Sequence, residues 1–184
     1  MSLKELEGFL NDDKKEGGVE INWENHKQEW LKSLDEFYTN IQTWLAPLVG
    51  ANLSLQLEPD VLVEDKIGSY ETNKMVIYIK GEKVVLQPIG TLIIGAKGRI
   101  DMIGPYGKVR FIYVDKRSTK PNITVRIIDS AMEKALKEQN PVEEKKEEDV
   151  EYDWKIATMP PNIKYIPLNE ETFSSHLLSV IKYA

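Results

Sequence analysis

The stretch from Lys74 to Asp115 constrains the fold of this chain most. It consists of short apolar or polar–apolar alternating runs that are separated by glycines. The run 75–79 (MVIYI) is rich in β-branched and aromatic residues, which suit a pleated, half-buried surface. Five glycines fall between the runs, where a chain reversal often needs a positive φ: Gly81, Gly95, Gly98, Gly104 and Gly107. Links of two to four residues join antiparallel neighbours, because a parallel pair needs a crossover of about a dozen residues. The stretch therefore predicts an antiparallel meander of about five strands or more, with one face buried and the other largely exposed to water.

A long amphipathic helix is predicted before the meander, beginning after the N-cap candidate Asn22 and ending near Pro47 and Gly50. Its apolar residues fall on heptad-spaced rows that form one wide stripe: Trp30, Leu31, Leu34, Phe37, Tyr38, Ile41, Trp44, Leu45 and Leu48. At 1.5 Å per residue this helix measures about 36 Å, whereas a seven-residue strand reaches about 23 Å. A helix of this length overhangs the sheet unless it lies diagonally, which makes Trp30 or Trp44 a candidate for a contact outside the domain. A homodimer through these two tryptophans is one such contact. The favoured interpretation is nevertheless that the aromatic residues of the stripe, including Trp30, Phe37 and Trp44, belong to the core.

The segments on either side of the meander extend the same pattern. Leu53–Lys66 alternates in polarity but contains Pro59, which predicts one or two strands with the proline at an edge or bulge. Tyr152–Leu168 indicates two short strands around a proline turn, and Asn169 is the predicted N-cap of a C-terminal helix. The predicted fold class is α+β, with the meander packed against the long N-terminal helix and the C-terminal helix in a single domain over residues 1–184.

Charge is segregated along the chain. Residues 138–153 hold eight acidic residues and two lysines, a net charge of −6 that equals that of the whole chain. Residues 97–126 hold eight basic and two acidic residues. A charge run is usually a solvated surface, so the ordinary interpretation is an acidic loop and an exposed sheet face. We predict a short helix and flexible connector over residues 1–18, and a mobile acidic loop over residues 138–151.

The segregated charges also suggest a binding surface. In this interpretation the acidic loop contacts a basic surface, which belongs to this protein or to a basic protein partner. The acidic side chains are Glu143, Glu144, Glu147, Glu148 and Asp149. The basic side chains of the protein itself are Arg99, Lys108 and Arg110, with cross-strand pairing to Asp101 as the alternative.

Several classes of protein are disfavoured by composition. The chain has no cysteine, which removes disulfides, thiolate metal sites and cysteine nucleophiles. The N-terminal segment shows no apolar core of a secretory signal, and no apolar run approaches the roughly 18 residues of a membrane span. No paired-histidine motif and no phosphate-binding loop appear, so no metal and no cofactor are expected. A soluble, cytoplasmic protein without a membrane partner is the expected class.

One catalytic pattern is similar in outline to that of metal-dependent nucleases of the restriction-endonuclease type. Such enzymes hold Mg²⁺ with two carboxylates and place a lysine beside them. Asp101, Asp115 and Lys116 are the candidates here, although Lys116 directly follows Asp115, which would point the two to opposite faces of a strand. Nucleic acid is not the favoured partner, because the sequence pI is about 5.1.

The favoured function is a protein-interaction module with no catalytic residue assigned. An adaptor, an immunity-type inhibitor of a basic partner and a subunit of a larger assembly all fit this class. The nuclease-like alternative requires that Asp101, Asp115 and a lysine converge in one pocket, which the fold can test.

Overall fold

The computed structural model describes residues 21–93, 95–121 and 150–182. The expected helix and connector over residues 1–18 and nearly all of the acidic loop lie outside the described residues. The elements are α2 (Trp23–Leu45), the 3₁₀ helix η1 (Ala46–Leu48), β1 (Leu53–Glu64), β2 (Gly68–Ile79), β3 (Glu82–Gly90), β4 (Gly98–Gly104), β5 (Gly107–Asp115), β6 (Tyr152–Ala157), β7 (Tyr165–Pro167) and α4 (Glu170–Ile181). Neither α2 nor α4, the α-helices of the described ranges, is long and apolar enough to cross a membrane.

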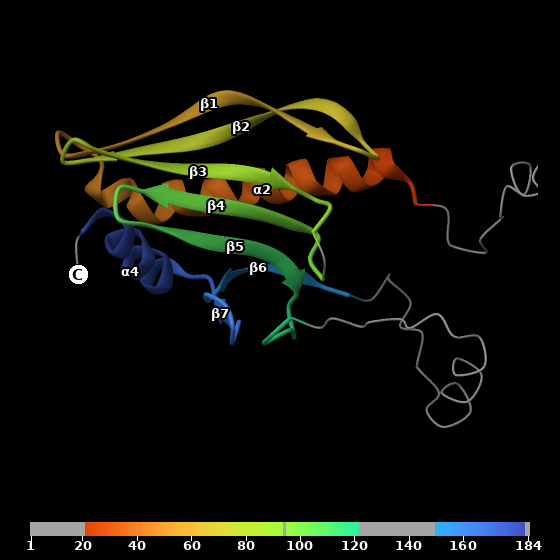
Figure 1. The fold of residues 1–184 in the computed structure, drawn as a ribbon. Coiled ribbons are helices and arrows are strands. Elements are labelled where there is room, and N and C mark those ends of the chain that lie inside the picture. The colour runs from red at the N-terminus through yellow and green to blue at the C-terminus, as the bar shows by residue number, and fades with distance from the viewer. Residues whose placement is uncertain (1–20, 94, 122–149, 183–184) are drawn as a thin grey trace, which may run out of the picture.

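The strands form one antiparallel sheet whose order follows the chain from β1 to β7 (Figure 1). The predicted meander and the α+β class are confirmed. Lys80 and Gly81, with φ of 49° and 86°, make the two-residue turn between β2 and β3, the reversal for which glycine was expected. The two short C-terminal strands also join the sheet, β6 beside β5 and β7 beside β6.

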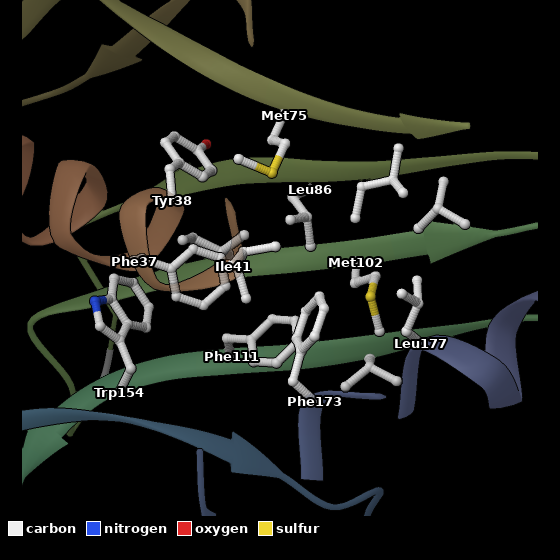
Figure 2. Packing of buried hydrophobic residues seen from close by; sticks show 14 of the residues in the cluster. Phe37, Tyr38, Ile41, Met75, Leu86, Met102, Phe111, Trp154, Phe173 and Leu177 are labelled. Atoms are coloured by element: carbon white, nitrogen blue, oxygen red, sulfur yellow. The ribbon is translucent and has the colours of Figure 1, made fainter. Parts of the chain in front are cut away.

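Both helices pack on the same face of the sheet. The Phe111 ring on β5 lies 5.2 Å from the Phe37 ring of α2 and 6.0 Å from the Phe173 ring of α4, measured between centroids. Figure 2 shows these three rings together with Met102 and Leu86 from the neighbouring strands. The indole nitrogen of Trp154 in β6 donates to the Ser33 carbonyl at 3.0 Å and so ties the sheet to α2. The buried aromatic cluster therefore joins both helices to the centre of the sheet.

Helix α2 begins as predicted, because the Asn22 side chain accepts a hydrogen bond from the Asn25 amide. The favoured interpretation of the stripe as core is confirmed for Trp30 and Phe37, whereas Trp30 as an outside contact is wrong. Trp30 is only 2% exposed, and Trp44 is partly buried against the Phe173 ring, so Trp30 cannot offer a contact to a second copy. The Trp30 ring packs against Gly98 of β4, where an added Cβ would lie 2.2 Å from it, and beside the Trp154 ring of β6 at 6.0 Å between centroids.

The opposite face of the sheet is less exposed than predicted. Ile112 and Val114 on β5 are buried there, at 6% and 1% exposure. Lys155, paired with Ile112 across β5 and β6, donates its ammonium group to the Lys116 and Ser118 carbonyls. Its aliphatic stem lies over this part of the face, which is how a lysine covers apolar surface while its charge is satisfied.

The β1–β2 hairpin projects beyond the rest of the sheet (Figure 1). Only residues 75–79 of β2 pair with β3, whereas β1 and β2 pair over their full lengths. Leu55 and Leu62 both pack against the core, although side chains an odd number of residues apart point to opposite faces of a flat strand. The pairing of β1 with β2 has no bulge that could explain this. The two-stranded ribbon must therefore twist about its long axis by roughly 180° between these residues, and two-stranded ribbons do twist more than wide sheets. Pro59 lies in one continuous edge strand, which was one of the predicted alternatives.

Candidate functional site

The predicted basic side chains do lie together on the outer face of β4 and β5. Their centre, however, is a carboxylate. Asp101 is 3% exposed and receives the Arg99 Nε and Nη2 atoms at 2.7 Å each, while the Lys108 ammonium lies 3.6 Å away. Hydrogen bonding to Asp101 raises the pKa of Arg99. Arg99 and Lys108 are therefore committed to a buried internal charge: Lys108 makes the cross-strand pairing given as the alternative, and Arg99 pairs with Asp101 within β4.

Arg110 stands directly opposite Asp101 in the β4–β5 register. Its Nε atom is buried and has no hydrogen-bond partner among the described residues. Of the three predicted cations, Arg110 is thus the least engaged by protein groups. The acidic residues predicted to meet this face, Glu143 to Asp149, lie outside the described residues, so their contact with it stays a prediction.

Other cations of the basic stretch have local partners. Lys97 lies 3.9 Å from Glu29 and 4.1 Å from the centroid of the Tyr152 ring. Lys116 pairs with Glu151 at 3.4 Å. Arg117 pairs with Asp115 at 2.9 Å. Much of the positive charge in this stretch is therefore neutralised within the fold.

The nuclease-like constellation does not converge. Asp101 is level with Arg110, and Asp115 lies five residues further along β5, about 17 Å away at 3.4 Å per residue. Because side chains alternate along a strand, Asp115 and Arg110 point to opposite faces. Asp115 binds Arg117, and Lys116 turns to Glu151. The described residues also contain no group of three His, Cys, Asp or Glu side chains placed to hold a metal ion. These three residues therefore lack the shared pocket that the alternative requires.

A different surface emerges at the free edge of the sheet. Strand β1 pairs only with β2, so its other side has no partner strand among the described residues. Three apolar side chains of one alternating series are exposed along it: Leu57 at 44%, Val61 at 57% and Val63 at 78%. Together with Pro59, which belongs to the same series, these residues form what we call the β1 stripe. Exposed apolar side chains on an unpaired edge are a combination that soluble folds usually avoid.

The backbone groups of the stripe point outward. Pro59 is opposite Asn73, whose carbonyl accepts a hydrogen bond from the Tyr38 hydroxyl at 2.7 Å. A proline in a strand is tolerated where its nitrogen faces away from the ladder, so this pair is of the non-hydrogen-bonded kind. Leu57, Val61 and Val63 are an even number of residues from Pro59, so they are also in non-hydrogen-bonded pairs and their backbone N–H groups face the open side. Pro59 leaves a one-donor gap between them.

Glu64 fastens the tip of the hairpin to the loop after β3. Its Oε1 atom accepts from the Tyr70 hydroxyl at 2.5 Å. Its Oε2 atom accepts from Thr91 N and Oγ1 at 2.9 Å each and from Leu92 N at 3.0 Å. Burial alone would raise the pKa of Glu64, but these hydrogen bonds outweigh it and lower the pKa. The projecting hairpin is therefore held at its tip as well as at its base.

A shallow hollow lies in the hairpin beside the stripe. It measures ≈ 520 Å³ and is lined by three successive cross-strand pairs: Pro59, Asp60, Val61, Glu71, Thr72 and Asn73. A hollow of the same volume lies on α4 beside Leu178, so volume alone does not distinguish the two. The hairpin hollow differs because it adjoins an unpaired strand edge with apolar side chains on both sides of Pro59.

Sequence reasoning missed this surface. The alternating run around Pro59 was the available signal, since a proline inside a strand pattern points to an edge. Which of the alternating residues were exposed depended on the half-turn of the ribbon, which no local pattern encodes. The chain matches no protein-family model, no curated protein and no solved structure.

Proposed function

We propose that this protein is a non-catalytic protein-interaction module that binds its partner along the open edge of β1. The observation that supports the proposal most is the β1 stripe, where outward backbone donors and exposed apolar side chains occur on the same residues. A partner strand added to such an edge gains main-chain hydrogen bonds from the first feature and side-chain burial from the second.

The hairpin is suited to this role because it is held in place before any partner arrives. Tyr38 holds its middle through the Asn73 carbonyl, and Glu64 holds its tip. A rigid edge loses little conformational freedom on binding, so more of the contact energy appears as affinity. Pro59 limits indiscriminate pairing by interrupting the row of donors, a common protection of edge strands.

The experiment is site-specific photo-crosslinking in the source cell. A photoreactive residue replaces Val63 in one variant and Leu178 in another, since Leu178 is an equally apolar residue with 53% exposure on α4. We expect a defined protein to crosslink through position 63 and not through position 178.

A backbone variant supplies the second arm of this experiment. Val61→Pro removes an outward donor and leaves the hydrogen bonds between β1 and β2 intact, so it should abolish the crosslink with little loss of stability. Equal crosslinking from position 178, or a crosslink that survives Val61→Pro in a folded chain, would contradict the proposal.

A further inference from the structure

Resting on the proposed function, we infer that the segment received by the β1 edge is an extended basic strand, with lysine or arginine alternating with apolar residues. The backbone donors and apolar side chains of the open edge suit an extended partner strand. The acidic residues around the hollow suit the basic side chains of that strand.

Negative charge dominates the hairpin. Residues 53–79 contain five acidic side chains and two lysines. Glu64 is used internally, and Glu58 lies 3.9 Å from Lys74, which accounts for one lysine. Asp60 and Glu71 lie beside the stripe, on the two strands that line the hollow, and the Asp60 carboxylate accepts a hydrogen bond from the Gln87 side-chain amide. Glu71 is exposed and forms no ion pair within the part of the chain that the structure describes.

The geometry brings an added strand within reach of Glu71. Val61 and Glu71 are directly opposite each other across β1 and β2. A partner residue placed opposite Val61 on the open side would continue this row across three strands, from Glu71 on β2 through Val61 on β1 to the partner. Its backbone would lie two strand spacings, about 9.6 Å, from that of Glu71. An extended lysine or arginine over the small Val61 side chain can span that separation and meet the glutamate. In an alternating partner strand the residues opposite Leu57 and Val63 lie on the same face and are therefore basic too, so their aliphatic stems would cover these two apolar side chains.

Charge argues against two other occupants of the edge. A second copy would place the same acidic hairpin against itself, and like charges across a strand pair are destabilising. The N-terminal segment 1–20 of this chain has six acidic residues and three lysines, so it is also repelled. A basic partner segment is the occupant that the hairpin favours.

The test uses Val61 as a charge reporter. The probe is a fluorescein-labelled peptide of alternating lysine and valine, and its counterpart of alternating glutamate and valine is the control peptide. Binding is measured by fluorescence anisotropy on the full chain and on Val61→Lys and Val61→Glu. Both substitutions remove the same apolar contact at an exposed site and differ in the charge that they introduce. The ratio of the peptide dissociation constants of the two variants therefore measures the effect of charge at position 61.

We expect the lysine peptide to bind and the glutamate peptide to fail. Val61→Lys should bind the lysine peptide at least about tenfold more weakly than Val61→Glu, since two unit charges of opposite sign separate the variants. Glu71→Gln should weaken binding by about three- to fivefold and reduce its salt dependence, whereas Glu170→Gln on α4 should leave both unchanged.

The outcomes separate the two proposals. If both Val61 variants bind the lysine peptide equally, or if Glu71→Gln behaves like Glu170→Gln, the basic-strand inference is overturned. A photo-crosslink from position 63 to a neutral or acidic segment would overturn it as well, but would leave the interaction module standing. A dimer in sedimentation that Val61→Pro abolishes would assign the edge to a second copy and would also overturn the inference.

Discussion

Replacing Glu64 by glutamine should loosen the hairpin through the loss of a single charge. The carboxylate accepts four hydrogen bonds, and three of them converge on Oε2 from Thr91 and Leu92. Glutamine can keep its amide oxygen on those three donors and turn its amide group to the Tyr70 hydroxyl, which can accept. Glu64→Gln therefore preserves the number of contacts and removes only their ionic character.

The expected loss follows from that difference. A hydrogen bond to a charged group contributes about 1.5–3 kcal/mol, whereas a neutral one contributes about 0.5–1.5 kcal/mol. Because the donors share two oxygens of one group, we expect a net loss of about 2–3 kcal/mol in the free energy of unfolding at pH 7 rather than a sum over four bonds. Glu58→Gln is the matched control in the same strand. Its contact with Lys74 is a long surface pair, expected to be worth less than about 1 kcal/mol.

The pH dependence supplies a second, independent signature. The pKa of Glu64 is lowered in the folded state from an ordinary value of 4.5. A depressed pKa contributes stability above the unfolded value, and this contribution is lost as pH falls through the folded value. The stability difference between the protein and Glu64→Gln should therefore be constant from about pH 6 to pH 8 and shrink below pH 4.5.

Urea unfolding, followed by tryptophan fluorescence at several pH values, measures this difference. A loss at pH 7 no larger than that of Glu58→Gln would refute the anchoring role of Glu64. A difference that stays constant down to pH 3 would refute the assigned ionic origin.

Three further predictions concern the core, a close contact and the acidic loop. Phe37→Ala should cost about 3–5 kcal/mol in urea melts, as expected for a buried aromatic side chain, and a much smaller loss would mean that this ring does not hold the cluster together. Gly104→Ala should destabilise the chain strongly, because an added Cβ would lie 2.4 Å from the Val180 carbonyl oxygen; an unchanged melting temperature would contradict this packing of α4. Replacing the acidic loop residues by glutamine should leave stability nearly unchanged but slow association with a basic partner and reduce its salt sensitivity, and unaltered association rates at low salt would make the loop a solvated linker only. That variant changes Glu143, Glu144, Glu147 and Glu148 together.

Local patterns in the sequence predict the elements of this fold well. The Asn22 cap, the apolar stripe of α2 and the meander from β2 to β5 all follow from periodicity and turn chemistry. The Asn169 cap of α4 is likewise present, completed by a reciprocal bond that the Asn169 backbone amide donates to the Thr172 hydroxyl oxygen. These features depend on residues within a few positions of one another.

The features on which the proposed binding rests depend on distant residues instead. Glu64 finds its donors 27 and 28 residues away, in a loop whose composition gives no sign of such a role. The half-turn of the hairpin changes which alternating residues are buried, so Leu62 turns inward and Val63 is exposed. The basic face was predictable as a cluster and Asp101 as a possible partner, but the choice between internal pairing and an outside contact depended on the burial of Asp101, which charge counting does not reveal.

Amide hydrogen exchange along β1, resolved by NMR, shows whether a partner strand pairs with this edge. In the free protein the outward amides of Leu57, Val61 and Val63 should exchange quickly, while the ladder amide of Leu62 should be protected. Saturation with the partner identified through position 63, or with the lysine–valine peptide, should slow the three outward amides and leave Leu62 unchanged. Outward amides that are already protected in the free chain, or that still exchange quickly in the saturated complex, would contradict partner binding at the β1 edge.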